Sequence, residues 1–235
     1  MRYFVFLVLC GCPIVINQTA RDANELCAQL LAQGKLDDAD AACDHALEYQ
    51  PKYWDALHNK GVIAQTRGDT KLAKKFYIEA LRANQHMATS LNNLGALEMN
   101  DGDLKSAIEH FRGALVVNPE YIEARYNLGT AHLQQKDFAA AAKDFRQMLI
   151  SNSNVVSAHL GLGSALMGLK EFDEACAVLE RATTLDVGDD RAWLMRAACE
   201  KEQGRLDQVK ESLERCILAN EKNLECQKVL KAIGD

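Results

Sequence analysis

The chain has 235 residues, of which 48% are hydrophobic and 26% charged, as in an ordinary soluble globular protein long enough to bury a sizeable core. Its net charge of −6 argues against nucleic acid as the main partner, because phosphate binding needs a surplus of Lys and Arg on one face. It contains only three prolines, which favours helices, since proline breaks them.

The first residues have the layout of an export signal. Met1 and Arg2 give a short positive start, residues 3–9 form an unbroken apolar run, and small residues follow. The run is too short to span a bilayer, which needs about 20 residues in a helix. We therefore expect residues 1–11 to be a signal peptide.

Residues 9–12 (Leu-Cys-Gly-Cys) resemble the bacterial lipoprotein box, in which cleavage falls directly before the last Cys. The resemblance implies cleavage after Gly11, acylation of Cys12, and a short tether over residues 12–19. Pro13 in place of Asp implies, by the sorting pattern of lipoproteins, the outer membrane, with the protein facing the periplasm. Several acyl chains on one Cys give stable attachment, whereas one chain binds marginally. An ordinary secretory signal with incidental cysteines is the alternative.

A pattern of 34 residues repeats along the rest of the chain. Small residues recur at its eighth, twentieth and twenty-seventh positions, and a large apolar residue stands at the twenty-fourth in most repeats. The eighth-position residues are Cys27, Gly61, Gly95, Gly129, Gly163 and Ala197. Small residues let two helices approach closely, and large ones fill the gaps at helical spacing. Glycines near the middle of four repeats and prolines near the end of two predict turns between helices.

This pattern resembles the tetratricopeptide repeat (TPR) family over residues 20–223. The resemblance implies an all-α, right-handed superhelical solenoid of six helix pairs, because no single repeat can bury its apolar face alone. The expected repeats 1 to 6 are residues 20–53, 54–87, 88–121, 122–155, 156–189 and 190–223. Residues 224–235 are expected to form a short capping helix.

Six cysteines lie within the predicted solenoid. The midpoint of each of three cysteine pairs falls in a predicted turn, and the partners of an antiparallel hairpin face each other across such a turn. We therefore predict the disulfides Cys27–Cys43, Cys176–Cys199 and Cys216–Cys226. They would staple both ends of the solenoid, where fraying is easiest. The alternative is that these cysteines are small core residues.

The sequence lacks the patterns of an enzyme, cofactor or metal site. There is no Walker-type loop, and the glycines at 161 and 163 lie in a predicted helix with no strand before it. None of the six histidines belongs to an H-E-x-x-H motif, and the acidic residues at 37–44 lack the spacing of a calcium loop, which favours a solvated helix face. We expect no enzymatic activity, no cofactor and no bound metal.

The first helix of each TPR lines the concave groove, so the resemblance implies that a partner binds there. Asn59, Asn93 and Asn127 occupy the sixth position of three successive repeats, which resembles the asparagine ladder by which some TPR proteins grip an extended peptide. An Asn amide donates and accepts at once, so it can bond a peptide unit whatever the side chain. Neighbouring groove residues are expected to be His58, Asn92 and Tyr126. Alternatively, these asparagines only hydrate the groove or cap local backbone.

The ladder stops at repeat 5, where Gly161 replaces Asn. The groove of repeats 5 and 6 is expected to present apolar residues instead, namely Leu160, Met167, Leu194 and Met195. Such a surface suits a hydrophobic anchor of a partner. The alternative is that these residues pack against the short final helix.

A lipoprotein signal followed directly by six TPRs resembles the pilotins of type IV pili and the lipoproteins of tight-adherence pilus systems. The resemblance implies a non-enzymatic scaffold that binds a protein client, such as a secretin subunit or another envelope protein, in its groove. Contact with the membrane would be through the lipid alone, and nucleic acid is not an expected partner. A general periplasmic adaptor that scaffolds cell-envelope enzymes is the alternative.

Overall fold

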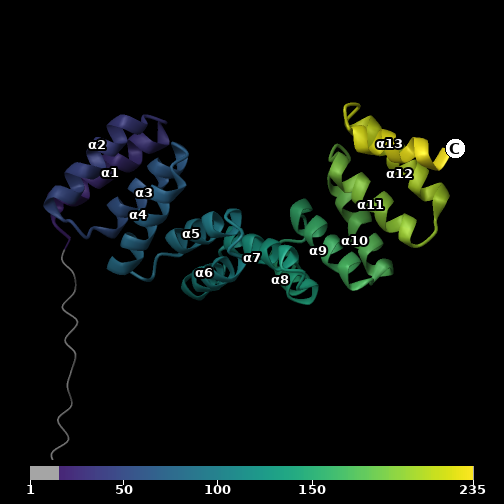
Figure 1. Cartoon of the computed structure of the whole chain (residues 1–235), viewed down its shortest axis with the longest axis horizontal. Helices are drawn as coiled ribbons and strands as arrows, with labels where there is room; N and C mark the ends of the chain where they lie inside the picture. Colours follow the sequence, from purple (N-terminus) through teal and green to yellow (C-terminus); the bar gives the residue numbers. More distant parts are fainter. Residues whose placement is uncertain (1–15, 235) are drawn as a thin grey trace, which may run out of the picture. The chain divides into compact units, whose positions relative to one another are not determined.

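The computed structural model describes residues 16–234, and within them every regular element is an α-helix (Figure 1). The predicted signal peptide (1–11) and the predicted lipid site Cys12 lie outside the described residues, and the predicted tether is described only from residue 16 onwards. Within the described part of the chain, no helix combines the length and the apolar character that crossing a bilayer requires.

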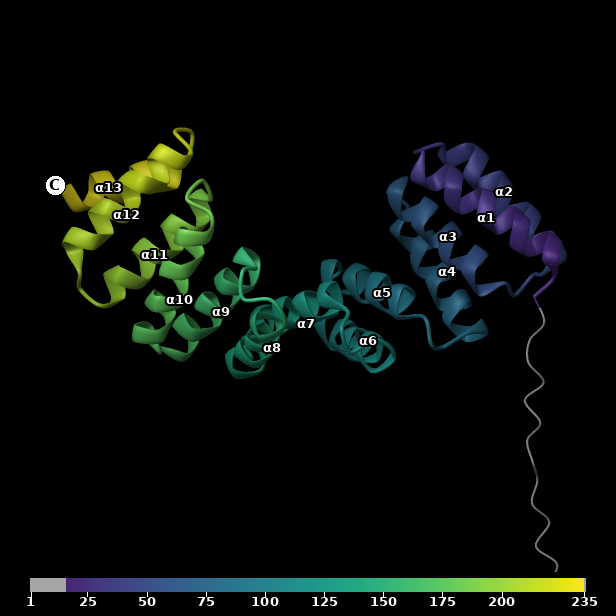
Figure 2. The same ribbon diagram turned by 180° about the vertical axis from the view of Figure 1, so that it is seen from behind.

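The helices follow one another as antiparallel pairs joined by short turns (Figures 1 and 2). The first helices of the six pairs are α1 (Gln18–Ala32), α3 (Trp54–Thr66), α5 (Ala88–Asn100), α7 (Ile122–Gln134), α9 (Val156–Leu169) and α11 (Asp190–Glu202). Their partners are α2 (Leu36–Tyr49), α4 (Thr70–Ala83), α6 (Leu104–Val117), α8 (Phe138–Ser151), α10 (Phe172–Leu185) and α12 (Leu206–Ala219). A further helix, α13 (Leu224–Gly234), packs on α12.

The turn inside each helix pair is built by local chemistry. Gly68 and Gly102 have φ of +81° and +84°, a left-handed conformation that glycine adopts without a Cβ clash. The carboxylates of Asp69, Asp103 and Asp137 then accept hydrogen bonds from backbone N–H groups of the following helix and cap its N-terminus. The same short signals in sequence therefore produce the same hairpin in successive repeats.

The small residues at the eighth position of the repeats are explained by the close approach of the two helices in each repeat. A Cβ added at Gly95 would lie 2.9 Å from Phe111 Cε1, and one at Gly129 would lie 2.9 Å from Phe145 Cζ. Real Cβ atoms do not tolerate such contacts, so glycine is required where the large residue of the second helix crosses the first.

The described helices divide into two compact units at Gln85 and His86. The N-terminal unit contains α1 to α4, and its buried clusters lie around Tyr53 and around the pair Cys27 and Cys43. The C-terminal unit contains α5 to α13, and its largest buried cluster joins α8 to α11 around Phe145 and Leu179. The predicted all-α fold of stacked helix pairs is confirmed.

The structure contains the three disulfides predicted from the hairpin geometry. The Cα atoms are 5.3 Å apart in Cys27–Cys43, 5.6 Å in Cys176–Cys199 and 6.3 Å in Cys216–Cys226. The first joins α1 to α2, the second joins α10 to α11, and the third ties α13 to α12.

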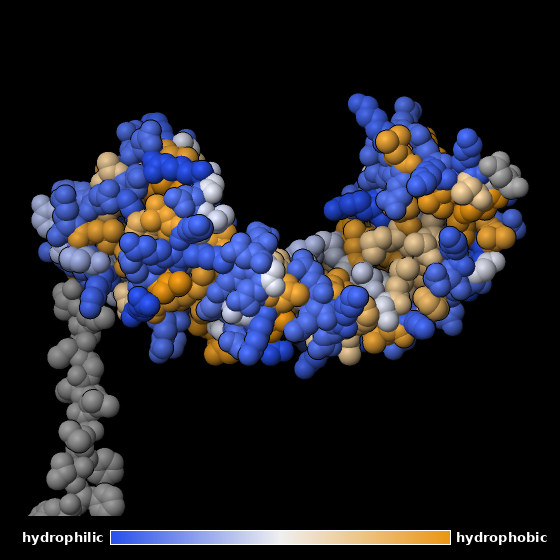
Figure 3. Space-filling model, in the orientation of Figure 1, coloured by the Kyte–Doolittle hydropathy of each residue, from blue (hydrophilic) through white to orange (hydrophobic). Residues whose placement is uncertain are grey.

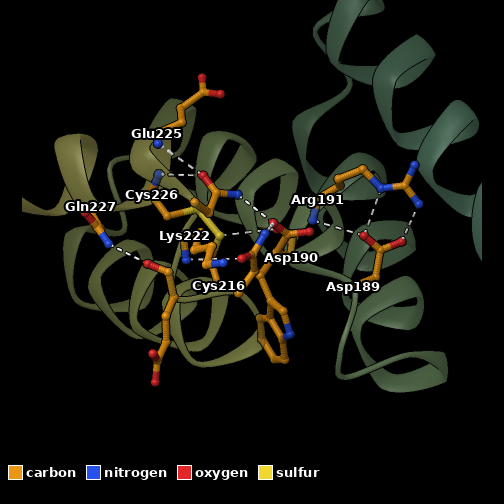
Figure 4. Close-up of a disulfide and its surroundings, with 12 residues drawn as sticks. Asp189, Asp190, Arg191, Cys216, Lys222, Glu225, Cys226 and Gln227 are labelled. Atoms are coloured by element: carbon orange, nitrogen blue, oxygen red, sulfur yellow. Dashed lines mark hydrogen bonds and ion pairs between the residues drawn. A yellow bond between two sulfur atoms is a disulfide. The ribbon is translucent and has the colours of Figure 1, made fainter.

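The last disulfide lies in a network of polar contacts around the start of α11 (Figure 4). The Asp190 carboxylate accepts hydrogen bonds from the side-chain amides of Asn220 and Asn223, each at 2.8 Å. Asn223 Oδ1 in turn accepts from the backbone N–H groups of Glu225 and Cys226, and so caps α13. Helix α13 is therefore held by the disulfide, by the Asn223 side chain at its N-terminus, and by the bond from Asn223 to the Asp190 carboxylate.

Candidate partner-binding surface

In the N-terminal unit, the predicted ladder residue Asn59 is bonded to another asparagine. Its Nδ2 donates to Asn24 Oδ1 at 2.9 Å, which links α3 to α1. Asn59 is half-buried, and its own Oδ1 has no partner in the described residues, so it can still accept a hydrogen bond from a peptide. The adjacent His58 packs against the Tyr77 ring with centroids 5.5 Å apart, and its burial lowers the imidazole pKa from 6.5 to about 4.

In the C-terminal unit, three predicted groove asparagines lie together. Asn127 Nδ2 donates to Asn92 Oδ1 at 2.9 Å, and Asn92 Nδ2 lies 3.5 Å from Asn93 Oδ1 and 3.4 Å from Glu123 Oε1. Asn92 is only 1% exposed, whereas Asn93 and Asn127 are half-buried. Asn92 therefore cannot present its amide to a partner, contrary to the prediction, and it orients its two neighbours instead.

The Asn59–Asn24 and Asn127–Asn92 hydrogen bonds connect equivalent positions of neighbouring repeats. Each joins the fifth position of one repeat to the sixth position of the next, 35 residues along the chain. The sequence suggested that the amides at the sixth position form a ladder that bonds a peptide. In the structure one N–H of Asn59 and one of Asn127 are used between repeats, because stacking brings neighbouring first helices within hydrogen-bond distance.

The ladder ends at Gly161 for a steric reason. A Cβ at this position would lie 2.4 Å from Phe145 Cζ, so no Asn side chain could be accommodated there. The same ring makes an edge contact with Tyr126, the centroids being 6.0 Å apart. Tyr126 remains 37% exposed, and this predicted groove residue can therefore reach a partner.

The four predicted apolar groove residues differ in their surroundings. Leu160 is buried, and Met167 and Met195 are half-buried against the cluster that joins α8 to α11. Leu194 packs instead in the last cluster, with residues of α13 such as Val229 and Leu230. The two methionines therefore remain candidates for partner contact. Leu194 instead packs in the cluster that supports the capping helix. Figure 3 shows hydrophobic colours gathered over the part of the C-terminal unit that Figure 1 labels α9 to α11.

Sequence reasoning missed a polar pair that joins the two helices of one repeat. Its members stand at the eleventh and twenty-third positions, and the pairs are Glu98–His110 at 2.6 Å, His132–Asp144 at 2.8 Å and Glu200–Ser212 at 2.8 Å. Because these are complementary donors and acceptors, the buried polar groups are satisfied. A search for complementary polar residues 12 apart in each repeat would have found all three pairs.

The acidic run in α2, interpreted from sequence as a solvated helix face, is mostly exposed, and it also forms ion pairs with α3. Lys60 bonds Asp40 and Asp44, and Arg67 bonds Asp37 and Asp40 at 2.6 and 2.7 Å. Burial alone would raise the pKa of Asp40, but hydrogen bonds and charge from Lys60 and Arg67 hold it below its ordinary value. These contacts join repeats 1 and 2.

Among residues 16–234, no group of His, Cys, Asp and Glu side chains has the arrangement of a metal site.

The geometry defines a class of protein: a repeat solenoid of helix pairs whose first helices carry half-exposed amide and apolar side chains. A sequence profile described as tetratricopeptide repeat matches residues 58–121, 92–156, 126–189 and 160–208, which together exceed half of the chain. The chain therefore belongs to the tetratricopeptide repeat family, whose helix pairs bind other proteins. A search of curated proteins finds no match.

Among solved structures, the chain resembles PilF of Pseudomonas aeruginosa, with 24% identity, a TM-score of 0.75, and coverage of 91% of this chain and 97% of that one. It also resembles PilW, described as a widely conserved type IV pilus biogenesis factor, with 20% identity, a TM-score of 0.75, and coverage of 91% and 99%. A third structure is YrrB, a TPR protein with an unusual peptide-binding site, with 20% identity, a TM-score of 0.71, and coverage of 81% and 98%. At these identities the likeness shows the shared fold.

Proposed function

We propose that this protein is an outer-membrane lipoprotein that faces the periplasm and helps a type IV pilus secretin, or a related secretin, to assemble. The observation that carries the proposal is a lipoprotein-like box at residues 9–12, shortly before a TPR solenoid, in a chain of which 91% matches the fold of PilF and of PilW. The three disulfides support an oxidising compartment.

The proposed mechanism separates location from binding. The acylated Cys12 holds the protein at the membrane, where several acyl chains give stable attachment. The first helices of the repeats hold an unassembled segment of the client, which would otherwise expose strand edges and pair wrongly. Asn59 in the N-terminal unit and Asn127 in the C-terminal unit are each suited to such binding within their own unit, because each keeps a carbonyl oxygen and one N–H for a peptide backbone.

Crosslinking inside the cell tests the proposal. A photoreactive amino acid would replace Asn93 on α5, with the same substitution at Val116, on the exposed outer side of α6, as the matched control. We expect the position 93 variant to capture the secretin subunit, the position 116 variant not to do so, and deletion of the protein to abolish secretin multimers.

Capture of a cell-wall hydrolase with normal secretin multimers would instead favour the general adaptor. Equal capture from positions 93 and 116 would argue that the first helices do not form the binding surface.

A further inference from the structure

A recess recurs at one place in the repeats, and its lining contains none of the predicted groove residues. It is bounded by the fourth position of the first helix, the loop before that helix and the last turns of the second helix. In repeats 2 and 4 its volume is about 380 and 20 Å³, with Leu57 and Arg125 at the fourth position. In repeat 6, where Trp193 stands at that position, the volume is about 610 Å³.

Two hydrogen bonds explain why the recess is wide in repeat 6 and nearly filled in repeat 4. In repeat 4 the Arg125 guanidinium donates to Pro119 O at 2.7 Å and fills the space. In repeat 6 the indole Nε1 of Trp193 donates to Val187 O at 2.9 Å, which holds the ring against the loop. The Arg196 guanidinium lies 5.6 Å from the centre of that ring. The tryptophan wall of the recess is therefore fixed before any ligand arrives.

The lining combines apolar side chains with positive charge. Val187 and Leu218 flank the recess and are 71% and 74% exposed. Two arginines and no acidic residue belong to the lining, although the whole chain has a net charge of −6.

The two arginines are not equivalent. Arg196 is neutralised by Glu200 at 2.8 Å and has Glu180 at 3.7 Å. The side chain of Arg215 has no ion pair or hydrogen bond with any described residue, so its charge is available to a ligand.

We propose that this recess, lined by Trp193, Leu218 and Arg215, binds a short peptide segment of a partner protein in which an apolar side chain lies beside a carboxylate. The apolar side chain packs between the indole and Leu218, and the carboxylate bonds the Arg215 guanidinium, which suits it by charge and geometry. An apolar ligand alone would leave the arginine unused, and a carboxylate alone would bind weakly at an exposed site. The recess shares no residue with the groove proposed for the client, so the two proposals stand independently.

Tryptophan fluorescence tests the proposal directly. The chain has two tryptophans, so a Trp54→Phe variant leaves Trp193 as the only indole. The probes are N-acetylated, C-amidated hexapeptides that carry Phe, Leu or Ile one, two or three residues from an Asp or Glu, and they contain no Trp. Matched peptides carry Asn or Gln in place of the acid. We expect saturable changes in Trp193 emission with acidic peptides, at a Kd on the order of 10–100 μM, and at least tenfold weaker binding of the amide peptides.

Variants in the same background locate the binding site. Arg215→Gln should weaken binding about tenfold, Arg215→Lys less, and Leu218→Ser about fivefold. Ile150→Ser is the matched control, because Ile150 occupies the equivalent position in repeat 4 and is 77% exposed. It should change Kd by less than about twofold.

Three outcomes would overturn the proposal: no saturable response to any acidic peptide up to about 1 mM, equal binding of acidic and amide peptides, or an effect of Ile150→Ser as large as that of Leu218→Ser. Phosphatidylglycerol vesicles that shift Trp193 emission where the peptides do not would assign the recess to a membrane surface instead.

Discussion

At the scale of single residues, the contacts at the groove depend on a few side chains whose surroundings the repeat pattern does not specify. Asn92 and Asn93 are neighbouring amides on one helix, yet Asn93 is half-buried, whereas Asn92 is buried and bonded to Asn127. His58 is held as a neutral imidazole against Tyr77. Such differences decide which amides a partner can reach.

The half-buried His58 predicts an acid-sensitive N-terminal unit. Its pKa is about 4 in the folded state and 6.5 when exposed, so the unfolded chain binds a proton first as the pH falls. Stability should therefore be full above pH 6.5 and decline as the pH falls from about 6.5 to about 4, by roughly 1–3 kcal/mol from this residue.

Denaturant unfolding at pH 7 and pH 4.5 measures this effect. His58→Gln should reduce the difference between the two curves, whereas His45→Gln, on the exposed surface of α2, should leave it unchanged. A difference that persists unaltered in His58→Gln would show that other groups cause the acid sensitivity.

A second residue-scale prediction concerns Gly161. Replacing a helical Gly by Ala normally gains up to about 1 kcal/mol, but here the new Cβ would meet the Phe145 ring at 2.4 Å. We expect Gly161→Ala to destabilise the C-terminal unit by about 1–3 kcal/mol in denaturant unfolding. Gly113→Ala is the control, because its nearest neighbour would lie at an ordinary 3.5 Å, and it should be neutral or stabilising. Equal effects of the two changes would refute the steric explanation for the end of the ladder.

At the scale of elements, α13 is an addition to the six helix pairs that depends on its attachments. It is 11 residues long, and a helix of this length is marginal in isolation. Its stability comes from the bond to Cys216, the Asn223 cap and the packing of Val229 and its neighbours against the buried cluster around Leu213. The buried apolar side of α11 is thereby covered at the end of the stack.

Removing the last disulfide should loosen α13 selectively. In a Cys216→Ser/Cys226→Ser variant we expect a local loss of about 2–3 kcal/mol, which corresponds to about 30- to 150-fold faster amide exchange in α13. The milder Asn223→Ala variant removes only the cap and should accelerate exchange about fivefold. Exchange that accelerates equally in α5 and α6 would mean that the bond stabilises the whole unit and not its end.

At the scale of the whole molecule, the proposed function requires the solenoid to be attached to a membrane through its N-terminus. The predicted lipid site, Cys12, stands four residues before the first described residue, Ile16.

The lipid anchor is tested by two neighbouring cysteines. Cys12→Ala should abolish labelling by radioactive palmitate and release the protein from the membrane fraction, because the acyl chains supply the attachment. Cys10→Ala should leave both unchanged, since the resemblance assigns acylation to Cys12 alone. Palmitate labelling that survives Cys12→Ala would contradict the proposed anchor.

The sequence by itself determined the helix pairs, the small-on-large packing and the pairing of the cysteines. All three depend on contacts between two successive antiparallel helices, where residue spacing fixes geometry, as in Gly95 under Phe111 or Cys27 opposite Cys43. Only the tertiary structure decided which groove residues stay accessible, why Gly161 ends the ladder, and that Trp193 leaves a recess open. These depend on how one repeat stacks on the next, and small differences in side-chain volume and loop hydrogen bonds across that contact leave no periodic trace in the sequence.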